Sequence, residues 1–200
     1  MDHYFTNNGN LKDDKKNIVT LIMETKMSLV SDSGVFSKDK VDYGTRLLLD
    51  NLPLSKIKGN ILDLGCGYGV VGIFIKKNID VTIDMVDINE RALVLAKRNI
   101  ELNSLRDIRV FVSDAYSNIT GKYDYIITNP PIRAGKSKVL EFLLGAVDHL
   151  NKEGELWFVM RKDHGVKTII KLMEESYNIE IVEKDKGFYI VKATTKNMHN

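Results

Sequence analysis

The fold is decided by the stretch Asn60-Ile61-Leu62-Asp63-Leu64-Gly65-Cys66-Gly67-Tyr68-Gly69, which is followed by an apolar run from Val70 to Ile75. Residues 60–64 predict a buried strand, and the apolar run predicts a helix. Glycines at alternate positions let the backbone turn tightly, and the N–H groups at the start of a helix favour an anionic group such as a carboxylate. The stretch therefore predicts a strand, a ligand-binding loop and a helix in succession.

The same alternation continues along the chain. The pattern predicts helices at 43–51, 89–102, 138–150 and 166–176, and strands ending at 64, 86, 113, 128 and 160. Strands that alternate with helices indicate a parallel sheet with helices on both faces. Residues 179–182 and 188–193 predict a closing antiparallel hairpin, and residues 21–29 alternate enough to suggest short antiparallel strands. The expected fold class is α/β.

The glycine loop allows two classes of cofactor. Gly67, Gly69 and Gly72 satisfy the pattern G-x-G-x-x-G, so a dinucleotide site is one interpretation. Asp63 favours a different class of cofactor, because a carboxylate lies unfavourably beside a pyrophosphate but accepts a hydrogen bond from an ammonium group. S-adenosylmethionine carries such an ammonium on its methionine part.

Two further aspartates follow predicted strands. Asp87 ends the strand that begins at Val81, where a carboxylate can accept from both ribose hydroxyls, as it also does in an NAD site. Asp114 follows the strand 108–113, where it can accept from an adenine amino group, a role that most dinucleotide sites do not need. Each aspartate alone is also typical of a turn or a helix cap. Three at successive strand ends favour S-adenosylmethionine.

A second motif, Asn129-Pro130-Pro131-Ile132, directly follows the apolar run Tyr125–Thr128. A proline has no N–H and fixes φ, and it pushes the preceding residue into an extended conformation, so Asn129 is held out from the strand tip. Its amide oxygen and the carbonyl of Pro130 can then accept from one exocyclic amino group. The alternative is a rigid turn that only ends the strand.

These motifs together resemble class I S-adenosylmethionine-dependent methyltransferases, and more narrowly the methyltransferase small domain family, which includes bacterial ribosomal RNA guanine-N2 methyltransferases. The resemblance covers almost the whole chain, with softer matches at 3–5, 34–37, 42–45 and 161–165. It implies a Rossmann-like seven-stranded sheet, mostly parallel, with a C-terminal antiparallel hairpin and a short N-terminal β extension. Residues 1–40 would form that extension near the active-site edge, and residues 41–196 the S-adenosylmethionine-binding domain.

The resemblance also implies roles for individual residues. Asn129 and Pro130 would hold the acceptor amine as catalytic residues. Many relatives that methylate amines carry an aromatic residue at the fourth motif position, where it stacks on the target base, whereas this chain has Ile132. Phe36 or Tyr4 are the alternative stacking candidates. The implied cofactor-binding residues are Thr45, Asp63, Gly65, Gly67, Gly69, Asp87, Asp114 and Asn129, and the implied substrate-binding residues are Pro131, Ile132, Arg133 and Phe36.

The expected activity is methylation of an exocyclic amino group, guanine N2 of ribosomal RNA above all. Ile132 agrees better with guanine-N2 members, where the fourth position varies, than with adenine-N6 or glutamine methylation. Three alternatives stay open: a methyltransferase acting on adenine N6, protein glutamine or a small metabolite; an NAD-dependent oxidoreductase; and a non-catalytic RNA-binding module. The expected partner is ribosomal RNA or a ribosomal subunit.

Composition fits one α/β domain, with 44% apolar residues, and excludes a disulfide framework, since Cys66 is the single cysteine. The start of the chain lacks a signal-peptide pattern, and no apolar run approaches membrane-spanning length, which predicts a cytoplasmic protein that does not bind a membrane. No metal site is expected, because His149 and His164 have no Cys or His neighbours at ligand spacing. The net charge of +2 is small. Six cations follow two predicted strands and are expected to meet RNA phosphates together: Arg133, Lys136, Lys138, Arg161, Lys162 and Lys167.

Overall fold

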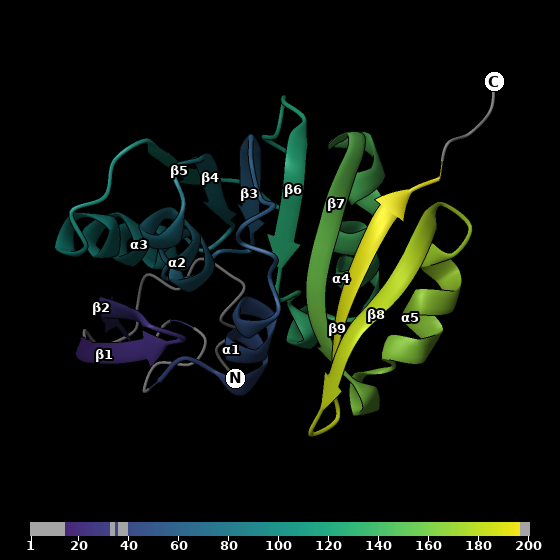
Figure 1. Cartoon of the computed structure of the whole chain (residues 1–200), viewed down its shortest axis with the longest axis horizontal. Helices are drawn as coiled ribbons and strands as arrows, with labels where there is room; N and C mark the ends of the chain where they lie inside the picture. The colour runs from purple at the N-terminus through teal and green to yellow at the C-terminus, as the bar shows by residue number, and fades with distance from the viewer. Residues whose placement is uncertain (1–14, 33–34, 36–39, 197–200) are drawn as a thin grey trace.

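The computed structural model describes residues 15–32, 35 and 40–196. Its centre is a seven-stranded sheet with the order β5-β4-β3-β6-β7-β9-β8 (Figure 1). The strands are β3 (Asn60–Leu64), β4 (Thr82–Asp87), β5 (Ile108–Val112), β6 (Tyr123–Thr128), β7 (Leu150–Arg161), β8 (Tyr177–Asp185) and β9 (Phe188–Thr195). The five neighbouring strands β5, β4, β3, β6 and β7 pair in parallel, and β9 is antiparallel to both β7 and β8. The expected mostly parallel sheet with a C-terminal antiparallel hairpin is confirmed.

Helices cover both faces of the sheet, as predicted. One face packs against α1 (Tyr43–Asp50), α2 (Val70–Asn78) and α3 (Glu90–Leu102), and the other against α4 (Lys136–Leu144) and α5 (Val166–Met173). Neighbouring strand residues divide between the two hydrophobic cores, because successive side chains of a strand point to opposite faces. Ile127 belongs to the core under α1–α3, and Ile126 belongs to the core under α4 and α5.

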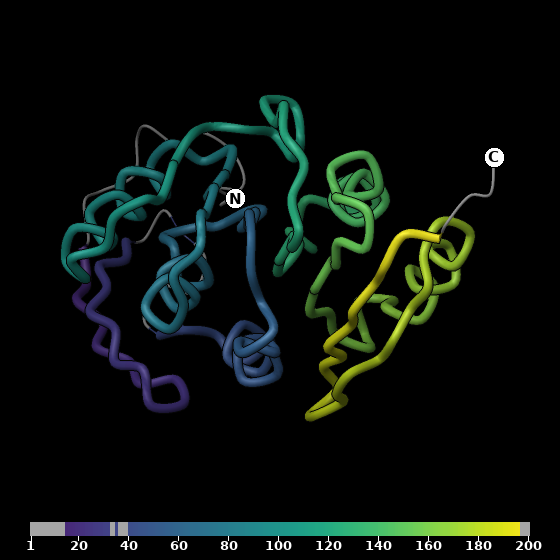
Figure 2. The backbone as a smooth tube through the Cα atoms, turned by 45° about the horizontal axis from the view of Figure 1, so that its top comes forward, coloured from purple at the N-terminus to yellow at the C-terminus, as the bar shows by residue number. Residues whose placement is uncertain are grey.

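The N-terminal strands form a separate two-stranded sheet, β1 (Lys16–Ile22) and β2 (Thr25–Ser31). This hairpin packs against α2 and α3, at the opposite end of the molecule from β8 and β9 (Figure 2). Asn99 of α3 pairs with the backbone of Val30: its Oδ1 accepts from the Val30 N–H at 2.6 Å, and its Nδ2 donates to the Val30 carbonyl at 2.9 Å. The expected N-terminal β extension is confirmed.

The predicted helix 138–150 was wrong at its end. Helix α4 stops at Leu144, a 3₁₀ turn η2 (Gly145–Asp148) follows, and Leu150 already begins β7. Gly145 is the C-cap of α4, and the Tyr177 hydroxyl shares its proton between the carbonyls of Leu143 and Leu144, at 2.9 and 3.1 Å, in the last turn of the helix. The apolar spacing continues past Leu144, which made the helix look longer.

In the described part of the chain, no helix has both the length and the apolar character that crossing a membrane would take.

Candidate active site

Two adjoining cavities lie where the strand order reverses, at the carboxyl ends of β3 and β6. This is the position at which open α/β sheets bind ligands. The larger cavity has a volume of about 350 Å³ and the smaller one about 100 Å³. Gly65, Asp87 and Asn129 line both of them. The loops predicted to hold the cofactor and the acceptor therefore meet at one site.

The glycine loop turns as its sequence predicted. Gly65, Gly67 and Gly69 have φ values of +71°, +54° and +98°, which L side chains rarely adopt. A Cβ added to Gly67 would meet nothing within 4 Å, so this backbone faces open space in the larger cavity. Gly72 differs, because its added Cβ would lie 2.7 Å from the sulfur of Met85. The last glycine of the G-x-G-x-x-G pattern thus serves helix–strand packing.

Asp63 lines the larger cavity although only 2% of its surface is exposed. One of its carboxylate oxygens accepts from the Gly72 N–H at 2.8 Å. Burial raises the pKa of this carboxyl to about 7, because removing the charge from water disfavours the ionised form. A cationic group in the cavity would restore the ionised form, so the site favours a ligand with a positive charge here.

Asp87 is fixed at the end of β4 by backbone donors. The Gly67 N–H donates to one carboxylate oxygen at 2.8 Å, and the Asn89 N–H donates to the other at 2.9 Å. Burial raises the pKa of Asp87, and these hydrogen bonds act in the opposite direction. Asn89 in turn caps α3, as predicted, by accepting from the N–H groups of Arg91 and Ala92. Each Asp87 oxygen retains capacity to accept from a ligand hydroxyl.

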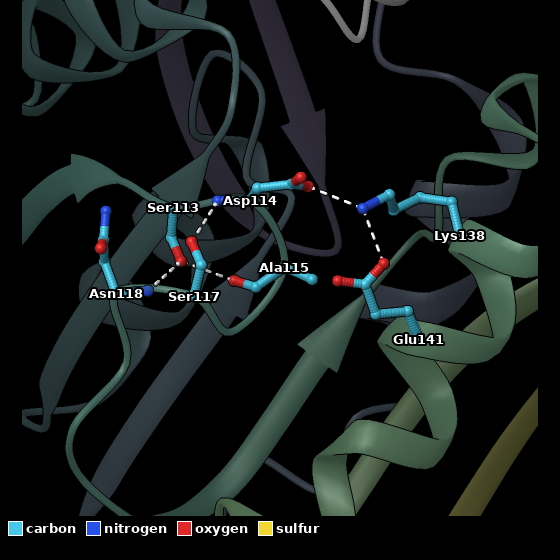
Figure 3. A network of polar contacts seen from close by, with 7 residues as sticks. All are labelled: Ser113, Asp114, Ala115, Ser117, Asn118, Lys138 and Glu141. Carbon is cyan, nitrogen blue, oxygen red and sulfur yellow. Dashed lines mark hydrogen bonds and ion pairs between the residues drawn. The ribbon is translucent and has the colours of Figure 1, made fainter.

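Asp114 lies in the smaller cavity, on the loop after β5 (Figure 3). Lys138 of α4 donates to its carboxylate at 2.8 Å and to Glu141 at 2.6 Å, and both acids raise the pKa of the lysine. The loop is closed by its own hydrogen bonds, because Ser113 Oγ donates to the Ala115 carbonyl at 2.7 Å. Lys138 therefore lies between two carboxylates at the adenine end of the predicted site.

Asn129 has its amide orientation set by α1. Its Nδ2 donates to Thr45 Oγ1 at 3.0 Å and to Asp42 Oδ1 at 3.4 Å. A carboxylate only accepts, so the amide nitrogen faces Asp42 and the amide oxygen is the free acceptor. Thr128 stabilises the strand tip, because its hydroxyl donates to the Leu64 carbonyl at 2.7 Å. The arrangement matches an acceptor placed at the cavity wall.

The proline motif continues into a tight turn. The Ile132 N–H donates to the Pro130 carbonyl at 2.9 Å, so an incoming amine would share that oxygen with Ile132. Pro130, Ile132 and Arg133 line the larger cavity, whereas Pro131 lines the smaller one together with Asp114. The predicted substrate residues are therefore divided between the two cavities.

Several cavity residues were missed by the sequence prediction. Asp42 is the N-cap of α1 and accepts from the Thr45 N–H at 2.9 Å, and an acid directly before a predicted helix is the signal that could have identified it. Tyr43 and Phe188 line the side of the cavity formed by α1, β7 and β9, together with Arg161, which the sequence had singled out only as a cation for RNA phosphates. No local signal places Phe188 there, because its position depends on how β9 pairs. Cys66 is buried in the glycine loop, and burial raises its thiol pKa.

The predicted stacking candidates Phe36 and Tyr4 lie outside the described residues, so their roles remain predictions.

Sequence comparisons match most of the chain. A model of the methyltransferase small domain family matches residues 26–192. "Uncharacterized protein YbxB" of Bacillus subtilis is 39% identical over 96% of this chain and 98% of its own length. "Ribosomal RNA small subunit methyltransferase C" of Colwellia psychrerythraea is 35% identical over 92% of this chain, and that of Vibrio parahaemolyticus is 40% identical over 89%. The chain spans about half the length of these two methyltransferases, 52% of each.

Solved structures share the fold at lower identity. The T. thermophilus 16S rRNA N2 methyltransferase RsmC, in complex with AdoMet and guanosine, has a TM-score of 0.82 and 22% identity over 91% of this chain and 51% of that one. A ribosomal protein L11 methylase from Lactobacillus delbrueckii subsp. bulgaricus has a TM-score of 0.68 and 21% identity over 82% of this chain and 89% of that one. These proteins act on RNA and on protein by name, so the shared fold does not select the substrate.

Proposed function

Because the chain belongs to the methyltransferase small domain family, we propose that it transfers the methyl group of S-adenosylmethionine to an exocyclic amine, namely N2 of guanine in ribosomal RNA. The observation that carries this proposal is the orientation of Asn129. Its amide nitrogen is held by Thr45 and Asp42, which leaves the amide oxygen to accept from an amino group at the cavity wall. Together with the Pro130 carbonyl it offers two acceptors, which match the two hydrogens of an amino group.

The residues of the site fit S-adenosylmethionine, the cofactor of this family. When bound, the cofactor supplies a methyl group on a positively charged sulfur and so an electrophilic carbon. Asp63 offers a buried carboxylate to its ammonium, and the open backbone at Gly67 offers close approach. Asp87 would accept from the ribose hydroxyls, and Asp114, in the adjoining smaller cavity, from the adenine amino group.

The chain's own residues act by orientation. Asn129 Oδ1 and the Pro130 carbonyl would accept hydrogen bonds from the two N–H groups of the guanine amine. These bonds would draw the nitrogen lone pair out of conjugation with the ring and aim it at the methyl carbon. Asp63, Asp87 and the glycine loop would hold the cofactor, which would supply the methyl group to that lone pair and keep the electrons of its carbon–sulfur bond, and the amine would release one proton to solvent. Holding the partners in line is worth up to about 7–11 kcal/mol of the barrier.

The other interpretations are less well supported. An NAD-dependent oxidoreductase would place a pyrophosphate beside the buried carboxylate of Asp63, where like charges repel. A non-catalytic RNA-binding module would not need Asn129 oriented by Thr45 and Asp42. Adenine N6, protein glutamine and small metabolites also present amines, and Ile132 argues mildly against the first two. Ribosomal RNA is proposed because two relatives named above are ribosomal RNA methyltransferases, and guanine N2 because the structural neighbour RsmC is named as a 16S rRNA N2 G1207 methyltransferase.

Further parts of the proposal concern the whole protein. We propose ribosomal RNA or a small ribosomal subunit as its partner and the cytoplasm as its location. Residues 1–40 would act as an extension of the methyltransferase unit 41–196, although the family match begins inside that extension, at residue 26. Val35, within this range, lines the larger cavity, which supports a place near the active-site edge.

The test is methyl transfer from labelled S-adenosylmethionine to unmethylated small ribosomal subunits, and to the extracted RNA, followed by nucleoside analysis. We expect labelled N2-methylguanosine at one position. Labelled N6-methyladenosine, labelled ribosomal protein or an absence of RNA label would contradict the proposed acceptor.

A variant tests the role of Asn129. Asn129→Ala removes the oriented acceptor, so we expect turnover to fall by at least about a hundredfold, the range found when an oriented polar group is removed from an active site. The affinity for S-adenosylhomocysteine, measured by calorimetry, should change little. Asn151→Ala is the matched control, because Asn151 donates to Asp124 at 2.8 Å and lines neither cavity. Equal losses of turnover and cofactor affinity in Asn129→Ala would refute the assigned role.

A further inference from the structure

One side of the larger cavity carries aromatic rings and cations that the proposed chemistry has not used. Tyr43 begins α1, Arg161 ends β7 and Phe188 begins β9, and all three line the cavity. Lys186 belongs to the turn between β8 and β9. Because β9 runs antiparallel to β7, its first residue lies at the carboxyl edge of the sheet, where Phe188 is the register partner of Arg161. The C-terminal hairpin thus returns to the active-site edge, near α1 (Figure 1).

The rings and cations contact one another in a fixed arrangement. The Tyr43 and Phe188 rings have centroids 5.5 Å apart at an interplanar angle of 51°. The guanidinium carbon of Arg161 lies 5.3 Å from the Phe188 centroid, and the Lys186 ammonium lies 4.6 Å from the Tyr43 centroid. Both distances are those of cation–π contacts. We refer to Tyr43, Arg161, Lys186 and Phe188 as the aromatic clamp.

The surrounding residues hold the clamp in place. An added Cβ on Gly44 would lie 2.9 Å from the Phe188 ring, so the ring reaches its position only because this residue is glycine. Asp163 accepts from both Arg161 Nε and Nη2 at 2.9 Å, which fixes the plane of the guanidinium. The Tyr43 hydroxyl donates to the Asp185 carboxylate. Three separate elements therefore converge on these side chains.

We propose that the aromatic clamp stacks on the nucleobase that carries the target amine, with Phe188 as the principal stacking residue; this inference rests on the proposed function. The residue after the two prolines is Ile132, which is not aromatic and cannot stack on the base. Another flat side chain must therefore provide the stacking surface. Phe188 and Arg161 provide one in the cavity that Asn129 also lines. The face of the base would stack on Phe188 and Arg161, while Asn129 accepts a hydrogen bond from its amino group.

The flat surfaces of the clamp favour a nucleotide over a peptide. Bases stack on aromatic rings and on guanidinium planes, and single-stranded RNA is recognised in this way. Arg161 and Lys186 also place cationic groups beside the stacked base, and the neighbouring carboxylates of Asp163 and Asp185 offset that charge, so the stacking surface carries this distinction. A protein glutamine offers neither a π-face nor a phosphate. The target nucleotide would have to be unstacked from its helix to enter the cavity, as other base-modifying enzymes require.

The experiment measures base binding without methyl transfer. The protein is saturated with S-adenosylhomocysteine, and guanosine 5′-monophosphate and a short single-stranded RNA are titrated in separate runs. We expect Phe188→Leu to weaken both affinities by about tenfold, the typical effect of removing one stacking ring. Phe188→Trp should retain affinity within about threefold, because it keeps a flat π-surface. Affinity for S-adenosylhomocysteine, measured first, shows that each variant is folded.

Matched controls separate stacking from general loss of structure. Tyr125→Leu removes a half-buried aromatic ring that lines neither cavity and should leave guanosine monophosphate binding unchanged. Lys186→Ala should weaken RNA binding, whereas Lys184→Ala should not, because Lys184 lies over Tyr189, which lines neither cavity.

The outcomes distinguish the clamp from the reaction. Loss of base binding in Phe188→Leu with retention in Phe188→Trp supports the clamp, even if the wild-type enzyme fails to methylate RNA and the proposed reaction is abandoned. Unchanged base binding and unchanged KM for RNA in Phe188→Leu, with a wild-type enzyme that methylates guanine, would overturn the clamp and leave the reaction standing. A wild-type enzyme that binds neither probe and methylates a protein would overturn both.

Discussion

At the scale of single residues, the site depends on a buried carboxyl group whose ionised form is disfavoured by its surroundings. Asp63 is 2% exposed, and burial raises its pKa to about 7. The pKa of Asp63 is higher in the folded protein than in the unfolded chain. The free energy of unfolding of the ligand-free protein therefore falls as the pH rises from about 4 to about 7. A bound ammonium group reverses this effect, because it stabilises the ionised form. The cofactor would therefore supply a charge partner that the described residues do not.

The affinity for S-adenosylhomocysteine should depend on pH through Asp63. Below pH 7 the free protein must lose a proton to bind the ammonium, so we expect the Kd to be about tenfold weaker at pH 6 than at pH 8. Calorimetry across this range measures the effect. Asp63→Asn should bind more weakly at pH 8 and show a flat profile. Asp80→Asn, an exposed carboxylate paired with Lys76, is the control and should keep the wild-type profile. A steep profile in Asp63→Asn would show that another group titrates.

At the scale of elements, two side chains of α3 form the hydrogen bonds to the outer edge of β2 that a neighbouring strand would otherwise form. Asn99 bonds to both backbone groups of Val30, and Asn103, one turn later, bonds to both backbone groups of Ser28. Four residues of a helix rise about 6 Å, and two residues of a strand advance about 6.6 Å, so the two spacings match. Asn99 also donates to the Tyr68 carbonyl in the glycine loop at 2.9 Å. The same side chain thus joins the N-terminal hairpin to the predicted cofactor loop.

Asn99→Ala should destabilise the protein and loosen the cofactor loop together. It deprives the buried N–H and carbonyl of Val30 of this partner, so we expect the free energy of unfolding to fall by about 2–4 kcal/mol. Asn103→Ala is the matched control, and its exposed bonds should cost less than about 1 kcal/mol. Urea unfolding measures both, and calorimetry with S-adenosylhomocysteine should show weaker binding for Asn99→Ala alone. Equal effects of the two variants would contradict this account.

At the scale of the whole molecule, the strand–helix order and the residues at the strand ends could be predicted from sequence, because each depends on local pattern. Asp63, Asp87 and Asn129 come together simply because parallel strands end at one edge. What could not be predicted depends on distant pairing, because Phe188 enters the cavity through the register of β9 with β7. A propensity or a motif carries no information on such contacts.

The distribution of charge over the molecule gives a final prediction. The net charge is only +2, yet exposed cations follow β6 and β7 at the active-site edge, among them Lys136 and Lys162. For single-stranded nucleic acid, each neutralised phosphate contributes about −0.7 to the slope of log K against log salt concentration. Lys136→Ala combined with Lys162→Ala should therefore reduce the slope for single-stranded RNA by up to about 1.4. Lys58 and Lys122 precede β3 and β6 at the opposite edge, so replacing both should leave the slope unchanged. Equal slopes for the two double variants would place the RNA away from the carboxyl edge.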